Sequence, residues 1–431
     1  MPAFLSPTRR LFSPTLVLGL LSCIGPFAID MYLPAMPAIA TDLGTTAQGM
    51  QGTITAYFVA FGVAQLFYGP WADQAGRKPP LYAGIVIFCI GTVMCLLAGS
   101  VGMLSAGRFV QGLGGAAMMV VPRAVIRDLS TGNEATRMMA AIMLVISVSP
   151  MLAPLAGAGL LVVASWRAIF VALLVAAAVS FLLLRFAQAE TLAPADRTKF
   201  NVGETLRGAK TLLTDRGFLS LTFLGAFGMG SFFVFLAAAP FVYTEAYGLS
   251  PTQFSLAFAV NALSFIGASQ LASPLGQRFG AVTVMKGATA LFALATGGLF
   301  ALALAGMVPL WVCILGLALG NAGLGLVIPT TMVMALDDHG TIAGLASSLG
   351  GTLQMLTGGV LVVIFGGWFD GTPAPMIGAI ALCAVIALAL SRLTRASKTA
   401  LREQAAEERN RQKRGVSCVL SYGLIPPFQR V

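Results

Sequence analysis

Two charged side chains lie inside long apolar runs of this sequence, and their types suit proton transfer. Asp30 lies in the run 15–37, and Arg108 lies in the run 103–122. At a rise of about 1.5 Å per residue, both would sit about 10 Å from the same end of two spanning helices. A carboxylate whose surroundings alternate between wet and apolar can take up and release a proton, and a nearby arginine favours its charged form. We therefore interpret Asp30 as a proton carrier that Arg108 tunes, directly or through water.

Each of these residues also has a structural interpretation, which the sequence leaves open. Asp30 could bond main-chain groups that Pro26 or Pro34 frees from the helical pattern. Arg108 could belong to a static pair that only fixes how two helices pack. The two interpretations can be told apart by the pH dependence of the protein's activity. Loss of a static group leaves that dependence unchanged, whereas loss of a proton-coupling group alters it.

Other chemistry has little support in the residue pattern. Of six cysteines, none is in a C-x-x-C motif; Cys418 lies near the end, and five lie in apolar runs as small core residues: Cys23, Cys89, Cys95, Cys313 and Cys383. His339 is the single histidine, which excludes metal centres that need two. The motifs G-x4-G-K-[ST], H-E-x-x-H and G-x-S-x-G are missing. We therefore expect no enzymatic activity, no metal, no cofactor and no direct use of ATP.

The composition indicates a membrane protein. Of 431 residues, 57% are hydrophobic and only 10% are charged, whereas soluble domains carry about 25% charged residues. The net charge of +10 would suggest nucleic acid in a soluble protein, but here it indicates basic loops between spans. Twelve apolar runs reach the roughly 20 residues that a spanning helix needs: 15–37, 50–70, 81–99, 103–122, 138–163, 166–185, 217–240, 252–273, 281–304, 309–333, 342–366 and 373–391. We expect an all-α polytopic membrane protein.

The basic residues predict the orientation. If the amino terminus is cytoplasmic, 24 of the 26 Lys and Arg residues fall in cytoplasmic segments. Arg167 alone falls in an outer loop, and Arg108 lies within a span. Lys and Arg concentrate on the cytoplasmic side of spanning helices. We therefore expect both ends of the chain in the cytoplasm of a bacterial-type cell, with the protein in its cytoplasmic (inner) membrane.

The order of runs predicts two halves. The longest polar stretch between runs is 186–216, with six runs before it and six after it, a pattern typical of parallel-repeat transporters. The turns that follow the second and eighth runs are both short and basic, around Arg77 and Arg278. The expected division is an amino-terminal segment 1–14, a six-helix bundle 15–185, a cytoplasmic linker 186–216, a second bundle 217–391 and a basic cytoplasmic tail 392–431.

The turn after the second run carries a specific motif, Gly69-Pro-Trp-Ala-Asp73-Gln-Ala-Gly76-Arg77-Lys78. Glycine permits a tight reversal, and a carboxylate can face the positive end of a helix. The spacing resembles the G-x3-D-x2-G-R-K signature of the major facilitator superfamily, which implies two six-helix bundles. The resemblance also implies that Asp73 contacts the start of the eleventh span and that Arg77 pairs with Asp128. Their implied role is a latch that holds the outward-open state without touching the transported molecule.

Further segments resemble the twelve-span drug/proton antiporters, and within them the Bcr/CflA multidrug efflux group. They read Asp30-Met-Tyr32-Leu-Pro34 in the first span, Arg108-x2-Gln111-Gly112-x-Gly114-Gly115 in the fourth, Ser149-Pro150-x2-Ala153-Pro154-x2-Gly157 in the fifth and Ala343-Gly344-x-Ala346-Ser347 in the eleventh. Ala153 stands where the antiporter motif usually has glycine. The resemblance covers residues 14–392. The small and kinking residues Gly112, Gly114, Gly115, Pro150, Pro154 and Gly157 would let the helices of spans 4 and 5 approach closely and bend.

The resemblance implies drug export in exchange for protons, with access alternating as the two halves rock. Arg108 belongs to the motif that the family uses for proton coupling. The alternative is a proton-coupled exporter or importer of a small metabolite on the same fold, since fold alone does not decide the substrate. We expect a monomer whose partners are a small-molecule drug, protons and the lipid bilayer, with no nucleic acid.

The candidate contacts to the drug are adaptable aromatic and methionine side chains and the amides within spans. They are Tyr32, Met118, Met119, Phe232, Phe233, Phe235, Tyr243, Asn261, Asn321 and Gln354. The amides are the stronger candidates, because exposing them to lipid would be costly. No other acid lies within a span, so the sequence predicts a mechanism with a single carboxylate.

Overall fold

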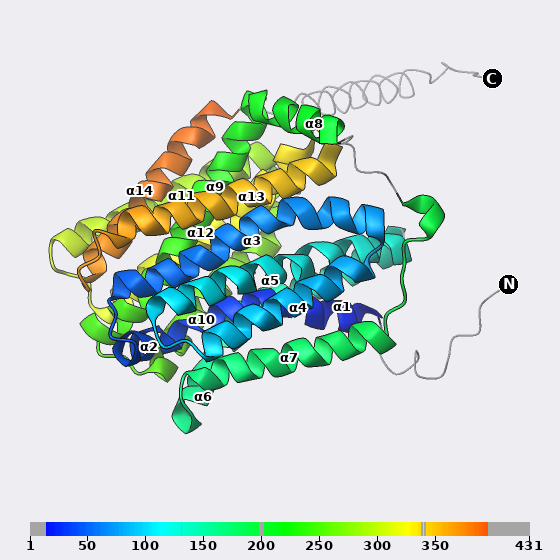
Figure 1. The fold of residues 1–431 in the computed structure, drawn as a ribbon. Helices are drawn as coiled ribbons and strands as arrows, with labels where there is room; N and C mark the ends of the chain where they lie inside the picture. The colour runs from blue at the N-terminus through cyan, green and yellow to red at the C-terminus, as the bar shows by residue number, and fades with distance from the viewer. Residues whose placement is uncertain (1–13, 131, 198–201, 338, 340–341, 395–431) are drawn as a thin grey trace, which may run out of the picture.

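A computed structural model describes residues 14–130, 132–197, 202–337, 339 and 342–394. Except for Pro14 and residues 392–394, the expected amino-terminal segment 1–14 and tail 392–431 lie outside the described residues. Within the described residues the regular structure is entirely helical (Figure 1).

Twelve stretches of helix in the described part are long and apolar enough to cross a membrane. The first half holds α1 (Pro14–Asp30), η2 (Leu33–Ala35), α2 (Met36–Asp42), α3 (Ala47–Ala75), α4 (Lys78–Leu96), α5 (Val101–Leu129), α6 (Gly132–Val163) and α7 (Arg167–Phe186). The second half holds α9 (Arg216–Phe241), η4 (Val242–Ala246), α10 (Pro251–Phe279), α11 (Ala281–Leu304), α12 (Leu310–Asp337), α13 (Ala343–Gly366) and α14 (Pro373–Leu393). All twelve predicted spans are present, and most are longer than the apolar run alone.

The first predicted span is present, but its helix is interrupted within the run 15–37 and extends beyond it. α1 ends at Asp30, and a short 3₁₀ turn leads into α2, which extends the span to Asp42. The cause lies in the sequence, because Pro34 has no N–H to donate to the carbonyl group of Asp30 four residues earlier. Beyond the break, Asp42 accepts hydrogen bonds from Trp166 Nε1 (2.9 Å) and Arg167 Nη1 (3.0 Å), which hold α2 against the start of α7.

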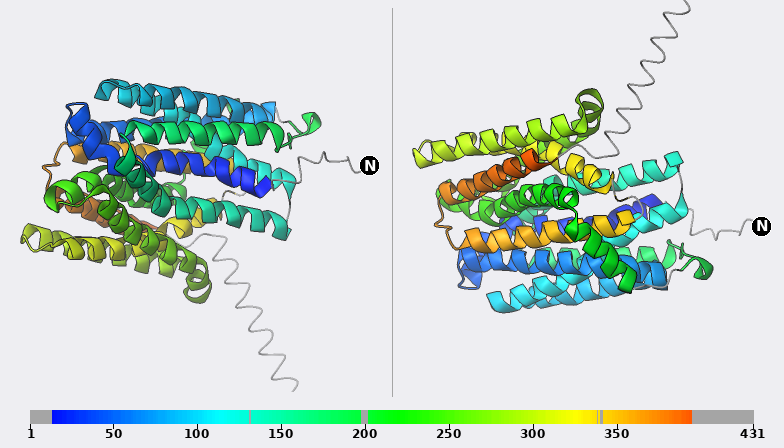
Figure 2. Two further views of the ribbon diagram at one scale, coloured as in Figure 1. Left: turned by 90° about the horizontal axis from the view of Figure 1, so that it is seen from below. Right: turned by 90° about the horizontal axis from the view of Figure 1, so that it is seen from above.

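The two halves repeat one pattern of helix packing. In the first half α5 packs against α3 and α4, and α1 packs against α6. In the second half α12 packs against α10 and α11, and α9 packs against α13. The halves meet where α3 contacts α13 and α6 contacts α10, which are equivalent pairs under this repeat. Figure 2 shows the earlier spans, blue to green, largely on one side of the bundle and the later spans, green to orange, on the other.

A linker joins the halves at one end of the bundle, which we name the linker end. The turn between α3 and α4 also lies there, since successive spans alternate in direction. The linker contains η3 (Pro194–Asp196) and the helix α8 (Val202–Thr214), which the sequence analysis did not predict and which packs on α13 (Figure 1). We name the opposite end, where α1 and α2 give way to α3, the far end.

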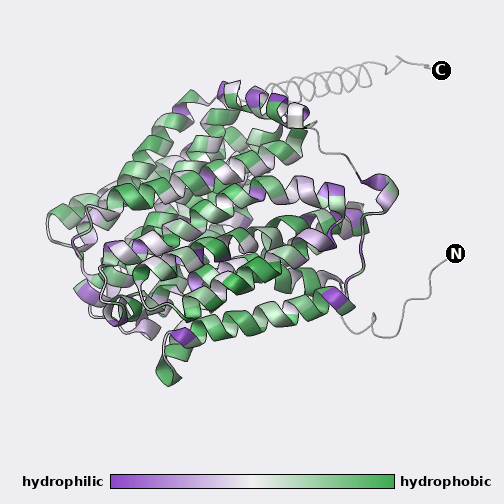
Figure 3. Cartoon of the chain, in the orientation of Figure 1, coloured by the Kyte–Doolittle hydropathy of each residue, from purple (hydrophilic) through white to green (hydrophobic). Residues whose placement is uncertain are grey.

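The outer surface is apolar along the length of the helices, and polar residues gather near their ends (Figure 3). Large exposed apolar side chains include Ile90, Val163, Leu294 and Trp368, as expected for helices that face lipid. Between α4 and α7 lies a groove of about 600 Å³ that is lined only by apolar residues: Ile85, Val86, Cys89, Ile90, Val93, Met94, Ala178, Phe181 and Leu182. This groove belongs to the first half alone and does not lie between the halves.

Candidate functional site

The carboxylate of Asp30 is buried at the break in the first span. Asp30 is the last residue of α1, and 5% of its surface is exposed. No hydrogen bond or ion pair of its carboxylate occurs among the described residues. The structural interpretation, in which Asp30 bonds main chain freed by Pro26 or Pro34, therefore has no supporting contact in the part of the chain described. An unpaired buried carboxylate is costly, and it is typical of sites that bind and release protons.

Arg108 on α5 is fully buried and binds main chain of α1. Its Nη1 donates to the carbonyl oxygen of Ala28 (2.8 Å) and to Oε1 of Gln111 (2.6 Å). The guanidinium carbon also lies 4.8 Å from the ring centre of Tyr32 and 4.5 Å from that of Tyr57, distances at which an aromatic face attracts a cation. Within the described residues, Nε and Nη2 are buried without a hydrogen-bond partner.

A short polar network continues from Arg108 across the first half. Gln111 Nε2 donates to Oγ1 of Thr92 on α4 (2.8 Å), and Thr92 donates to the carbonyl oxygen of Phe88 (2.6 Å). On the other side, the hydroxyl groups of Tyr32 and Thr53 are hydrogen-bonded at 2.7 Å. The network thus joins α1, α3, α4 and α5 around one buried cation. The sequence analysis had not assigned a role to Gln111, Thr92 or Tyr57. The signal for Gln111 was its position within the Arg108 motif.

Asp30 and Arg108 are linked indirectly and form no salt bridge with each other. Among the described residues, no carboxylate oxygen lies within 4.0 Å of a nitrogen of Arg108. The link is indirect, because Arg108 binds the carbonyl group of Ala28, two residues before Asp30. The direct form of the predicted pairing is therefore absent from this conformation, and the route through water stays a prediction.

At the linker end, Arg77 bridges two carboxylates. Its Nε and Nη2 donate to Asp128 Oδ2 (2.7 Å) and Oδ1 (3.0 Å), and its Nη1 donates to Asp73. Partial burial disfavours the charged form of Arg77, but these two carboxylates raise its pKa above the ordinary value. The Asp73 side chain is 53% exposed and binds Arg77. The structure thus contains the Arg77–Asp128 pair, while no ion pair between Asp73 and the described residues of the eleventh span is present. Lys78 begins α4, and its Nζ donates to the carbonyl oxygen of Gln188 (2.7 Å).

The small residues of spans 4 and 5 lie where helices nearly touch. A methyl group on Gly112 would lie 2.5 Å from the carbonyl oxygen of Tyr57, and one on Gly114 would lie 2.3 Å from the N atom of Phe88. The same addition at Gly115 or Gly157 would also meet another helix within 3.0 Å, whereas Gly69 has open space. Pro150 and Pro154 both lie inside α6. These glycines, apart from Gly69, lie in close-packed seams, and Gly157 lies against Met31, the residue after Asp30.

The halves are in contact at the middle of the spans and toward the far end. Thr352 Oγ1 on α13 donates to the carbonyl oxygen of Gly62 on α3 (2.7 Å), and Ser255 Oγ on α10 donates to that of Pro154 on α6 (3.0 Å). The rings of Phe58 and Phe233 stack across the halves, with centroids 4.0 Å apart. Nearer the linker end, a methyl group added to Gly351 on α13 would lie 2.9 Å from Oε1 of Gln65 on α3, so the halves also approach each other there.

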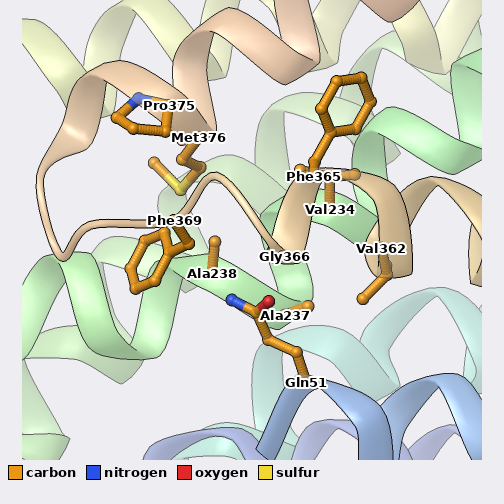
Figure 4. Close-up of a pocket in the computed structure, with 10 residues that line it drawn as sticks. All are labelled: Gln51, Val234, Ala237, Ala238, Val362, Phe365, Gly366, Phe369, Pro375 and Met376. Atoms are coloured by element: carbon orange, nitrogen blue, oxygen red, sulfur yellow. The ribbon is translucent and has the colours of Figure 1, made fainter. Parts of the chain in front are cut away.

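A small cavity near the far end is too small for a drug. It holds about 10 Å³, enough for one water molecule at most, and it lies among α3, α9, α13 and α14. Figure 4 shows its lining residues, in which the Gln51 amide is the polar group. Drug-sized ligands need roughly 300–1,000 Å³. In this conformation no drug site is therefore formed in that cavity.

Most candidate drug contacts are buried within the halves. Tyr32, Met118, Phe233, Phe235, Tyr243, Asn261 and Asn321 are buried, whereas Met119, Phe232 and Gln354 are half-buried. Asn321 Nδ2 donates to Asn261 Oδ1 (3.1 Å), so the two amides satisfy each other. Phe232 stacks on Phe265 of α10 at 6.1 Å, beside the Phe58–Phe233 contact. The structure thus brings the aromatic residues of α9 to the interface between halves, and it buries Tyr32 inside the first half beside Arg108.

One functional candidate was missed entirely by the sequence analysis. Glu190, in the linker, accepts hydrogen bonds from the main-chain N–H groups of Arg77 and Lys78. In the sequence it is one charged residue of a polar stretch, and its partners lie more than one hundred positions earlier. No local pattern could have revealed this contact.

Comparison with known proteins gives a consistent picture. The model of the Major Facilitator Superfamily matches residues 18–360. The chain is 31% identical to the Bicyclomycin resistance protein homolog of Haemophilus influenzae over 86% of this chain and 94% of that protein. It is 30% identical to the Chloramphenicol resistance protein of Pseudomonas aeruginosa over 91% of each, and 32% identical to the uncharacterized MFS-type transporter YdgK of Bacillus subtilis over 84% and 90%.

The fold also matches solved structures. The crystal structure of a D-xylose-proton symporter superimposes with a TM-score of 0.72, at 16% identity, over 89% of this chain and 98% of that one. At that identity the match shows the arrangement of helices alone.

Proposed function

Since the chain belongs to the major facilitator superfamily, we propose that it exports small drug-like molecules across the cytoplasmic membrane in exchange for protons. The names of two relatives, a bicyclomycin resistance protein homolog and a chloramphenicol resistance protein, support the substrate class. The fold of two repeated six-helix bundles supports alternating access by rocking of the halves. A transporter of this kind needs no catalytic residues and acts as a monomer.

The observation that carries the proposal is the buried carboxylate of Asp30 at a break in a spanning helix, without a hydrogen-bond or ion-pair partner in the part of the chain described. Broken spans at mid-depth are typical of transporter binding sites. Arg108 holds the main chain just before Asp30 and keeps two N–H donors without a partner in the described residues. A proton on Asp30 and a drug near Arg108 can then compete, so that entry of one promotes release of the other.

The orientation follows from the charges. The linker end carries the basic segments, so it faces the cytoplasm under the positive-inside rule. The far end accordingly faces the periplasm. In the proposed cycle, the latch between the turn and α13 forms in the outward-open state.

A drug panel tests the proposal. Everted membrane vesicles are energised, and the proton gradient is followed with a fluorescent dye while bicyclomycin, chloramphenicol and other drugs are added. We expect at least one drug to dissipate part of the gradient in vesicles that contain the protein and not in vesicles without it. If a correctly inserted protein responds to no drug and responds to small metabolites instead, the substrate class is wrong and the fold serves metabolite transport.

A further inference from the structure

One carboxylate fastens the start of the linker to the first half. Glu190 Oε1 accepts a hydrogen bond from the N–H of Arg77 (2.9 Å), and Oε2 accepts one from the N–H of Lys78 (3.0 Å). Oε1 also accepts from the N–H groups of Thr191 (3.0 Å) and Leu192 (3.1 Å). The carboxylate therefore caps the first turn of α4, where N–H groups have no helical partner and the helix dipole favours an anion.

Neighbouring contacts hold the same linker segment, Gln188–Leu192. Lys78 Nζ donates to the carbonyl oxygen of Gln188 (2.7 Å), and Thr191 Oγ1 donates to Asp128 Oδ2 (2.9 Å). Asp128 is also the carboxylate that binds Arg77. The segment thus touches the start of α4 and the end of α5, on both sides of the Arg77–Asp128 pair.

Gly76 makes room for this arrangement. Its φ is +97°, a region that favours glycine. A methyl group added there would lie 2.7 Å from Glu190 Oε2. The glycine of the turn motif therefore permits both the reversal of the chain and the approach of the linker carboxylate.

The end of the linker belongs to the other half. Leu212 of α8 is fully buried in an apolar cluster with residues of the second half, including Phe218 and Leu345. A methyl group on Gly208 would lie 2.8 Å from Leu345. Each half thus holds its own end of the linker, through hydrogen bonds to one carboxylate at the start and through apolar packing at the end.

We infer that Glu190 is a positioning residue, which fixes Gln188–Leu192 to the first half and holds the start of α4 so that Arg77 can bridge to Asp128. The observed contacts support this fastening independently of the proposed function. Its consequence for turnover rests on the proposed transport function: a linker that is fixed at its start lets the first half rock as one body. Without Glu190, part of each rocking movement is lost in local movement of the turn.

Hydrogen exchange tests the fastening without any substrate. The full-length protein is placed in lipid nanodiscs, and exchange is measured by mass spectrometry in peptides that cover residues 76–80 and 188–192. We expect Glu190→Gln to exchange about tenfold faster in both peptides, since hydrogen bonds to a charged group contribute about 1.5–3 kcal/mol. The matched control is Asp196→Asn, which removes the same charge from an exposed position of the same linker. Unchanged exchange in Glu190→Gln overturns the inference.

Transport measurements test the consequence. For a drug found with the vesicle assay, we expect Glu190→Gln to lower the maximal rate severalfold and to leave the half-saturating drug concentration unchanged, because Glu190 does not touch the drug. A rate equal to that of the wild type, together with faster exchange, overturns the role in turnover. If the wild-type protein moves no drug at all, the proposed function fails, while the exchange result still decides whether Glu190 fastens the linker.

Discussion

The guanidinium of Arg108 is tied to the carbonyl group of Ala28, and that bond spans 2.8 Å between α5 and α1. Because Ala28 lies two residues before the break at Asp30, any movement of α1 against α5 changes the surroundings of both charged residues together. Coupling between them therefore does not need a salt bridge. The bond gives the proposed exchange of proton and drug a mechanical link.

Replacing Asp30 by Asn should abolish proton movement driven by drug. Asparagine keeps the shape of the side chain and cannot carry a proton, so drug can still bind while the exchange stops. The measurement is the dye response of everted vesicles, with Glu245→Gln, an exposed acid at the far end, as the control. A drug response in Asp30→Asn equal to that of the wild type would rule out Asp30 as the proton carrier.

Replacing Arg108 should alter how transport depends on pH. Arg108→Ala leaves the carbonyl group of Ala28 and Oε1 of Gln111 without a donor, and each unsatisfied buried group costs about 1–3 kcal/mol. We therefore compare it with Arg108→Lys, which keeps the charge and loses the planar fork. The rate is measured across a pH series for protein amounts matched by inserted fraction. An unchanged pH profile in Arg108→Ala would support the static packing alternative.

The spans were predictable because a spanning helix depends on about 20 apolar residues in a row, which is a local property. The Arg77–Asp128 pair was predictable from a family resemblance, because the turn motif fixes both its spacing and its place. The break at Asp30 was also within reach, since the effect of Pro34 on the carbonyl group of Asp30 can be read from the sequence. The helix α8 was missed because its residues are too polar for a span.

Contacts between distant segments were not predictable in the same way. Glu190 accepts a hydrogen bond from Arg77, which lies far earlier in the sequence. Arg108 donates to the main-chain carbonyl group of residue 28, which any residue type at that position would present. Burial of Tyr32 also depends on packing, as its hydroxyl group is satisfied by Thr53 of α3. Such partners are set by how the helices pack, and a single sequence holds no record of that.

Enlarging Gly157 should separate α6 from the break in the first span. A methyl group there would lie 2.2 Å from the carbonyl oxygen of Met31, the residue after Asp30. Overpacking of this kind costs about 1–3 kcal/mol, so we expect Gly157→Ala to lower both thermal stability and transport rate. Gly159→Ala is the matched control, because nothing lies within 4 Å of its added methyl group. Equal behaviour of the two variants would show that the α1–α6 seam can yield without consequence.

The Arg77–Asp128 pair should show a measurable coupling energy. Its side chains are 8% and 16% exposed, and the contact has two hydrogen bonds. In its degree of burial, the ion pair is therefore intermediate between exposed and fully buried pairs. A double-mutant cycle with Arg77→Ala, Asp128→Ala and the double variant should give about 1–3 kcal/mol in unfolding measurements in detergent. A coupling energy near zero would mean that the pair marks the turn and does not stabilise it.

The fastening by Glu190 should resist acid down to about pH 4. Partial burial tends to raise the pKa of its carboxyl group, but hydrogen bonds from the N–H groups of Lys78, Arg77, Leu192 and Thr191 lower it below the ordinary value. A carboxyl group with a lowered pKa stabilises the fold fully above its unfolded value of about 4.3, and this contribution is lost as pH falls through the lower folded value. Arg197 and Asp128 are the charged side chains beside the same turn and linker segment. Exchange at residues 76–80, corrected for its intrinsic pH dependence, should therefore stay constant from pH 7.5 to pH 5.5 and rise only below about pH 4. In Glu190→Gln it should be fast at every pH. Loss of protection between pH 7 and pH 5 in the wild type would mean that another group controls the fastening.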